Sequence, residues 1–130
     1  SEIAVDSEGF LTHSNHFLCD PHACEANDAA SLPDSFPRFE RINTLIGKQS
    51  GSLDVASMKS ILADHDGHPV SICRHPHAGH GNAMLPNSGR TVAAIIAEPG
   101  RGRFHIASGN PCEAPFVEYQ LSRFPQSDAS

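Results

Sequence analysis

The chain has 130 residues, 38% of them apolar and 20 of them Gly or Pro (10 of each), so we expect one loop-rich domain over 1–130 with a thin core. Its net charge of −6 offers no basic stripe to neutralise phosphates, and this excludes nucleic acid as a partner. No apolar run approaches the roughly 20 residues that cross a bilayer and no signal peptide opens the sequence, so we expect no membrane association.

The first part of the chain predicts a β-hairpin followed by a loop. A short apolar run at 3–5 and a strand over 10–17 flank the turn residues Asp6-Ser7-Glu8-Gly9. Residues 18–34 are rich in Asp, Asn, Pro, Ser and Ala and have no hydrophobic period, which is typical of a loop.

From Ser35 onward the pattern changes to that of a helical pair. Apolar residues recur at steps of three and four, which predicts an amphipathic helix that ends at Gly47 or Gly51. Ser52 or Asp54 can cap a second helix. The predicted buried positions of the two helices are Phe36, Phe39, Ile42, Leu45 and Ile46, then Val55, Met58, Ile61 and Leu62.

The last half of the chain predicts strands. After a brief strand at 70–74 and a Gly- and His-rich loop, the apolar run 91–97 indicates a strand buried on both faces. A turn at 99–102 leads to its hairpin partner. The remaining predicted segments are strands over 103–107 and 116–121 and a frayed tail over 122–130. This order predicts an α+β fold, an antiparallel sheet with helices on one face.

Histidine and cysteine gather in two clusters, which raises the hypothesis of a zinc site. The first has the pattern H-x2-H-x2-C-x2-H-x-C and the second contains His65, His68, Cys73, His75, His77 and His80. Neither cluster has paired C-x2-C ligands, and two histidines three residues apart on a strand point to opposite faces. Loop and pocket histidines are the simpler interpretation, so we expect no metal. A zinc-binding module is kept as the alternative, with His13, His16, Cys19 and His22 as its ligands.

No residue of the chain has the surroundings of an activated nucleophile. Cys19 and Cys73 are near histidines in sequence, but proximity in sequence is not pairing in space, and isolated cysteines are usually buried apolar residues. Ser1 could use its own α-amine as a base, yet nothing marks it as a processing product. The four cysteines are too scattered for a disulfide scaffold, which favours a reducing, cytoplasmic compartment.

Two polar segments suggest a substrate pocket instead. Asn15 lies between two histidines at the end of a predicted strand, where its amide could donate to a developing oxyanion. Arg74 ends a second strand, and its guanidinium could hold a carboxylate. The simpler interpretations are a loop-anchoring amide for Asn15 and a surface salt bridge for Arg74.

At these residues the chain resembles the isopenicillin-N acyltransferase-like family of N-terminal-nucleophile hydrolases. Leu11-Thr12-His13-Ser14-Asn15-His16 is similar to the family's H-T-N-H segment, and Leu32-Pro33-Asp34-Ser35 with Arg38 and Arg41 to its L-P-D-S-x2-R-x2-R motif. Asp64-His65 and Ser71-Ile72-Cys73-Arg74 follow in the same order, and 91–97, the hairpin and Gly109-x-Pro111 resemble the closing strands. The resemblance extends over about 3–121. Each motif is short, but the order and spacing of all of them make the match fairly specific.

The resemblance implies a four-layer αββα sandwich of which this chain is the C-terminal portion. Such enzymes cleave themselves before a Cys that becomes the nucleophile, and they move acyl groups from amides or thioesters to an amine or to water. By position, Asn15 would be the oxyanion-hole residue, and Ser71, Arg74 and His16 would bind substrate. No cofactor is implied, although a coenzyme A thioester can serve as the acyl donor of the whole enzyme.

The chain also departs from the family pattern. The Gly-Cys cleavage pair and the nucleophile belong to an N-terminal portion that this sequence does not contain, and the His-rich loop 75–82 is richer in Gly and His than expected. We therefore expect this chain to be inactive alone, with that N-terminal portion as its partner. Its unpartnered sheet should expose an apolar face that favours homo-oligomers.

Overall fold

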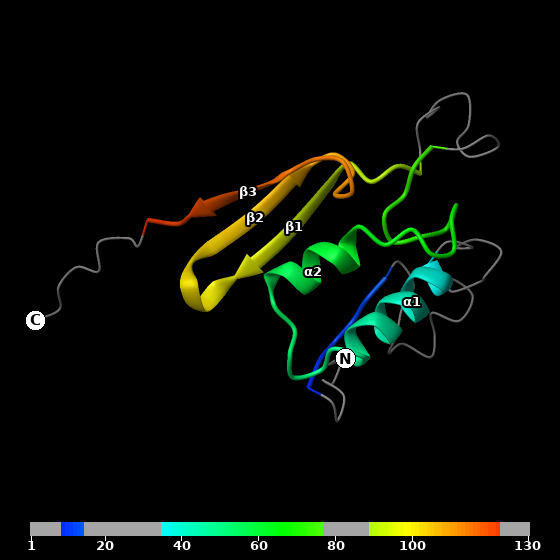
Figure 1. Cartoon of the computed structure of the whole chain (residues 1–130), viewed down its shortest axis with the longest axis horizontal. Coiled ribbons are helices and arrows are strands. Elements are labelled where there is room, and N and C mark those ends of the chain that lie inside the picture. The colour runs from blue at the N-terminus through cyan, green and yellow to red at the C-terminus, as the bar shows by residue number, and fades with distance from the viewer. Residues whose placement is uncertain (1–8, 15–34, 77–88, 123–130) are drawn as a thin grey trace, which may run out of the picture.

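A computed structural model describes three parts of the chain, residues 9–14, 35–76 and 89–122 (Figure 1). They contain two α-helices followed by a three-stranded antiparallel sheet. The predicted α+β class is confirmed at this level. No helix in the described ranges is long and apolar enough to cross a membrane.

The two helices form where the apolar periodicity predicts them. α1 is Ser35–Gly47 and α2 is Val55–Leu62. Gly47 is thus the predicted end that α1 adopts. Asp54 is the N-cap of α2: its carboxylate accepts a hydrogen bond from the backbone N–H of Ser57 at 2.7 Å, which satisfies one of the free donors of the first turn.

The sheet is a meander of the three predicted C-terminal strands. β1 is Ala93–Glu98, β2 is Arg103–Ser108 and β3 is Phe116–Gln120, and they pair in the order β1-β2-β3. A 3-10 turn, η2 (Pro99–Arg101), connects the first two strands. It ends at Gly102, whose φ of 62° lies in the left-handed region that glycine adopts without steric cost.

The core lies between one face of the sheet and α2. Ala94, Ile96 and Ala107 are buried on that face, and Ile61 of α2 is only 2% exposed. α2 packs against β1 and α1 packs against α2 (Figure 1). The ammonium of Lys59 on α2 lies 5.4 Å from the centre of the Phe116 ring, so a side chain of α2 also reaches β3.

The other face of the sheet is apolar and exposed. Ile95, Ile106 and Val117 lie opposite one another in the register of the three strands, and Phe104 pairs with Tyr119 beside them. Ile95 is 61% exposed and Tyr119 is 52% exposed. The prediction that 91–97 is buried on both faces is therefore wrong in this structure, because burial alternates along β1 and only one face is covered.

Two predicted strands do not form within the described residues. Residues 10–14 are irregular, and the hydroxyl of Thr12 donates to Oδ1 of Asn43 on α1. Residues 70–74 form bends, and the backbone N–H of Cys73 donates to the carbonyl of Asp64 instead of to a strand. The rest of the predicted first hairpin, and the tail beyond 122, lie outside the described residues.

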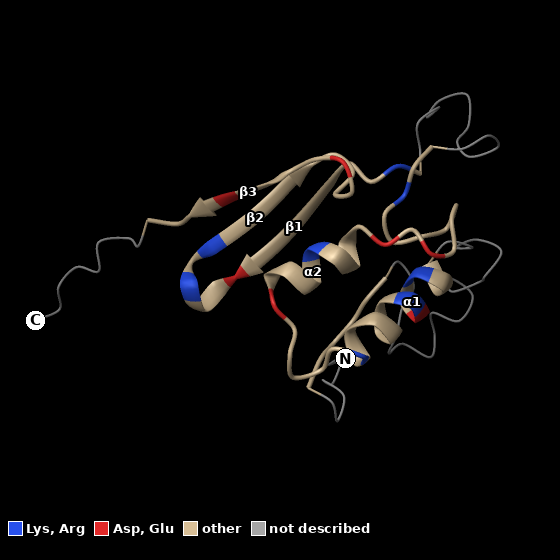
Figure 2. Ribbon diagram, in the orientation of Figure 1, with Lys and Arg blue, Asp and Glu red and all other residues tan. Residues whose placement is uncertain are grey.

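Charged residues of both signs lie at and beside the turn between β1 and β2 (Figure 2). Glu98 accepts hydrogen bonds from His105 at 2.9 Å and Arg101 at 3.3 Å, and Arg103 lies 3.4 Å from the same carboxylate. This network ties the two strands together next to the turn that connects them.

Candidate functional site

The segment before Asn15 is attached to the start of α1. Ser35 is 1% exposed, and its hydroxyl donates to that of Ser14 at 3.1 Å. A small cavity of about 80 Å³ lies beside this contact. It is lined by His13, Ser14, Arg38, Ile42 and Ile72. Residues of the two segments of the hypothesised pocket, His13 and Ser14 before Asn15 and Ile72 within Ser71–Arg74, thus border one cavity, and α1 lines it with them.

The predicted substrate-binding residues of the second segment are held by contacts within the chain. Ser71 is 1% exposed, and its hydroxyl donates to the carbonyl of Cys73 at 2.6 Å. The backbone N–H of Arg74 donates to the hydroxyl of Thr91 at 2.9 Å, which joins this stretch to the residues before β1. Ile72, between them, is the residue that lines the cavity. Asn15 and His16 lie outside the described residues.

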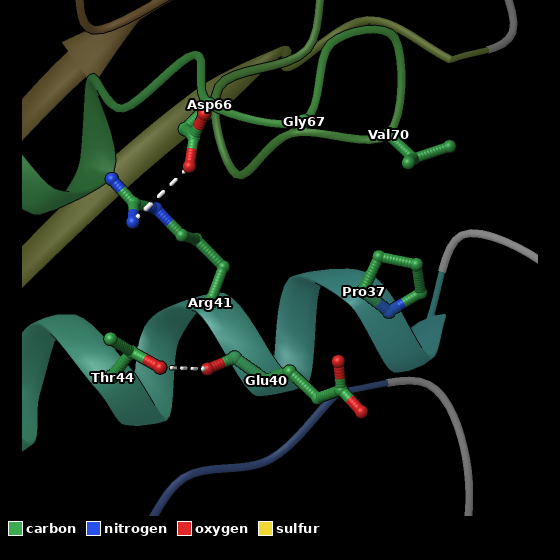
Figure 3. Close-up of a pocket in the computed structure, with 7 residues that line it drawn as sticks. All are labelled: Pro37, Glu40, Arg41, Thr44, Asp66, Gly67 and Val70. Carbon is green, nitrogen blue, oxygen red and sulfur yellow. Dashed lines mark hydrogen bonds and ion pairs between the residues drawn. The ribbon is translucent and has the colours of Figure 1, made fainter.

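A second hollow, of about 270 Å³, lies between α1 and the turn that follows α2 (Figure 3). Arg41 crosses it. Its guanidinium makes two hydrogen bonds to the carboxylate of Asp64, at 2.9 and 2.7 Å, and an ion pair with Asp66 at 3.2 Å. The Arg41 hydrogen bonds hold the pKa of Asp64 below its ordinary value. Arg41 is thus paired with two carboxylates of the segment after α2. We interpret this hollow as a structural contact between α1 and that segment, not as a ligand site.

Two cysteine sulfurs and two imidazole nitrogens converge where the segment after α2 meets the β2–β3 connection. They belong to His65, Cys73, His75 and Cys112, and all lie within 4.8 Å of one another. His65 follows α2, Cys73 and His75 come from the irregular stretch after it, and Cys112 lies in the β2–β3 connection. Cys73 is completely buried and His65 is exposed, so the group extends from the protein interior to its surface.

The neighbours of this group fix its backbone. Asn110, 6% exposed, donates from Nδ2 to the carbonyl of Arg74 at 2.6 Å and lies 3.5 Å from the sulfur of Cys73. The bond from the N–H of Cys73 to the carbonyl of Asp64 holds the residue before His65 against Cys73.

Three of these four residues belong to the second His/Cys cluster of the sequence, whereas Cys112 was not predicted. A signal was present, since Cys112 follows Gly109-x-Pro111, but a hairpin separates it from His75. His68 of the same cluster is outside the group of four. Of the first cluster, His13 lines the small cavity, whereas His16, Cys19 and His22 lie outside the described residues.

Neither described cysteine is an activated nucleophile. Cys73 is fully buried, and desolvation together with the hydrogen bond between the two cysteine sulfurs raises the pKa of the Cys112 thiol, although Cys112 as a whole residue is exposed. No protein-family model matches this chain. The assignment of function therefore rests on the residues and their arrangement.

Proposed function

We propose that this chain is the C-terminal portion of a self-processing acyltransferase or amidohydrolase of the isopenicillin-N acyltransferase-like family. In this proposal an N-terminal Cys on another portion of the protein is the nucleophile. The 130-residue chain itself would supply the oxyanion donor Asn15 and the substrate-pocket residues His16, Ser71 and Arg74. The chain alone would be inactive, and the acyl donor would be an amide or a thioester.

The observation that carries the proposal is the cavity shared by His13, Ser14, Arg38 and Ile72. Each of these residues belongs to a segment with family resemblance, and the segments are far apart in sequence. Family motifs that served only local structure would not need to meet. Ser14 immediately precedes Asn15, so the backbone that leads to the proposed oxyanion donor borders this cavity. A preorganised amide at such a position stabilises the negative charge of a tetrahedral intermediate.

The exposed sheet face supports the same proposal. A sheet with helices on one face and an apolar opposite face is what one half of a four-layer αββα sandwich would present. In the proposed whole protein, a second sheet from the N-terminal portion covers Ile95, Ile106 and Val117. Without that sheet, the chain would bury the same face by associating with other copies.

The test is to express the complete reading frame that contains this chain and to determine the N-termini of the mature polypeptides. We expect cleavage directly before a Cys, on the N-terminal side of Ser1, and turnover of acyl p-nitroanilides or acyl-coenzyme A thioesters by the processed protein. A reading frame that holds no Gly-Cys pair ahead of Ser1, or a product that never cleaves, would refute the proposal.

In the processed protein, Asn15→Ala should lower kcat by about a hundredfold or more, because the oxyanion loses a preorganised donor. The matched control is Asn27→Ala, since Asn27 lies outside the segments with family resemblance. Equal rates for the two variants would remove Asn15 from the mechanism.

A further inference from the structure

We infer that His65, Cys73, His75 and Cys112 form a structural zinc site. The inference does not depend on the proposed acyl-transfer function. It rests on the distances among the four ligand atoms, on the inability of hydrogen bonds to explain them, and on the closure of the site by protein groups.

The distances among the ligand atoms are those of a tetrahedral zinc complex. With Zn–S bonds of about 2.3 Å and Zn–N bonds of about 2.0–2.1 Å, the edges of the tetrahedron are about 3.8 Å for S–S, about 3.6 Å for N–S and about 3.3 Å for N–N. Here Cys73 Sγ and Cys112 Sγ are 3.6 Å apart, and the Nε2 atoms of His65 and His75 are 3.1 Å apart. His75 Nε2 lies 3.2 Å from Cys112 Sγ and 3.9 Å from Cys73 Sγ.

Hydrogen bonding alone does not account for this convergence. An imidazole nitrogen has either one N–H or one lone pair, and both lie in the ring plane. Yet Nε2 of His75 approaches three other ligand atoms, those of His65, Cys73 and Cys112. One N–H or lone pair cannot be directed at all three, whereas lone pairs aimed at a common central ion satisfy all four ligands together.

The donor set selects the metal. Two thiolates and two imidazoles suit Zn²⁺, while Mg²⁺ and Ca²⁺ require oxygen ligands. Four protein ligands complete a tetrahedral shell and leave no open position for water or substrate. The site is therefore structural and not catalytic.

The positions of the ligands in the chain show what the zinc ion would hold together. It would join the end of α2, through His65, to the irregular stretch 71–75 and to the β2–β3 connection, through Cys112. These parts have little regular secondary structure between them. Asn110 beside Cys73 provides the outer-shell hydrogen bonding that orients metal ligands. The ion would thus fix the Ser71–Arg74 stretch against the sheet.

The test uses the full 130-residue chain, freed of metal by a chelator and kept reduced. Titration with Co²⁺ should give thiolate-to-cobalt charge transfer and the intense visible bands of tetrahedral cobalt, at about one ion per chain. Zn²⁺ should displace the cobalt and raise the thermal midpoint of unfolding. Wild-type protein without tetrahedral cobalt bands would overturn the inference.

Variants assign the ligands. Cys112→Ser changes an exposed residue, and it should weaken binding by about a hundredfold or more, since even the loss of an outer-shell partner costs 10- to 100-fold. His65→Gln should do the same independently. The control for the latter is His68→Gln, an exposed histidine in the same turn and outside the group, which should bind as wild type does.

Two results would contradict the assignment. If His68→Gln weakens binding as much as His65→Gln, the effect is not one of coordination by this group. If Cys19→Ser abolishes the cobalt bands while Cys112→Ser retains them, the metal belongs to the N-terminal His/Cys cluster. Circular dichroism of the metal-free variants, compared with metal-free wild type, identifies any variant that fails to fold. If either Cys112→Ser or His65→Gln misfolds, the other variant alone decides whether the group binds the metal.

Discussion

Glu98 is the residue whose ionisation is most closely tied to the fold of the hairpin. The hydrogen bond from His105 lowers the pKa of its carboxyl below the ordinary value of 4.5, and the positive charges of Arg103 and Arg101 act in the same direction. A carboxyl whose pKa is lower in the folded protein stabilises the fold above its unfolded pKa. That contribution is lost as the pH falls through the folded pKa.

We therefore expect Glu98→Gln to lower the urea midpoint at about pH 7, and the difference from wild type to vanish at about pH 2, where both proteins carry no charge at this position. The control is Glu118→Gln. Glu118 is 53% exposed and makes only a 3.6 Å ion pair with Arg103, so its loss should leave the midpoint almost unchanged. A difference for Glu98→Gln that persists undiminished at low pH would show that the charge is not the cause.

Among the elements, α2 packs against both α1 and β1 of the sheet and contributes the most deeply buried large side chain of the core. That side chain is Ile61, the largest fully buried side chain of α2. Ile61→Ala should lower the free energy of unfolding by about 2–5 kcal/mol, because it removes buried methyl groups and leaves a cavity. Urea denaturation measures this.

The matched control is Ile95→Ala, which makes the same chemical change at a residue that is 61% exposed on β1. Its cost should be well under ~1 kcal/mol in dilute protein, below the concentration at which the chain self-associates, because Ile95 is then open to solvent. Similar costs for the two variants would mean that the apolar face around Ile95 is already covered in solution.

The helices and the hairpin could be predicted from sequence because their signals are local. Apolar steps of three and four, a capping Asp54 and the turn at 99–102 each determine their own neighbourhood. Of the strand predicted over 10–17, the described residues 10–14 are irregular, and the side chain of Thr12 is bonded to Asn43 of α1, a long-range contact that no local pattern reveals. Burial of 91–97 on both faces was also mispredicted, since an apolar run reveals hydrophobicity but not which neighbours are present.

The His/Cys group shows the same limit at the level of the whole molecule. His65, Cys73 and His75 are close in sequence, and their chemistry could be read there. Cys112 joins them only because β1 and β2 form a hairpin that returns the chain to the end of α2. A ligand that depends on tertiary structure has no local spacing rule, unlike the knuckles of zinc fingers.

The exposed sheet face determines how the whole molecule should behave in solution. Ile95, Ile106 and Val117 form a continuous apolar row across three strands, and nothing within the described residues covers it. In the 130-residue chain this row should promote self-association, because burying it removes apolar area from water. The double variant Ile95→Lys/Val117→Lys should therefore sediment as a monomer at concentrations where wild type forms larger species.

The control is Ala56→Lys/Ser60→Lys, which adds the same charge on exposed positions of α2 and should self-associate as wild type does. In the complete processed protein, the sheet-face variant should instead prevent stable assembly with the N-terminal portion and abolish activity. A monomeric wild type would show that the exposed sheet face does not cause self-association by itself. A fully active sheet-face variant of the complete protein would show that no second sheet packs there, and the αββα architecture would have to be abandoned.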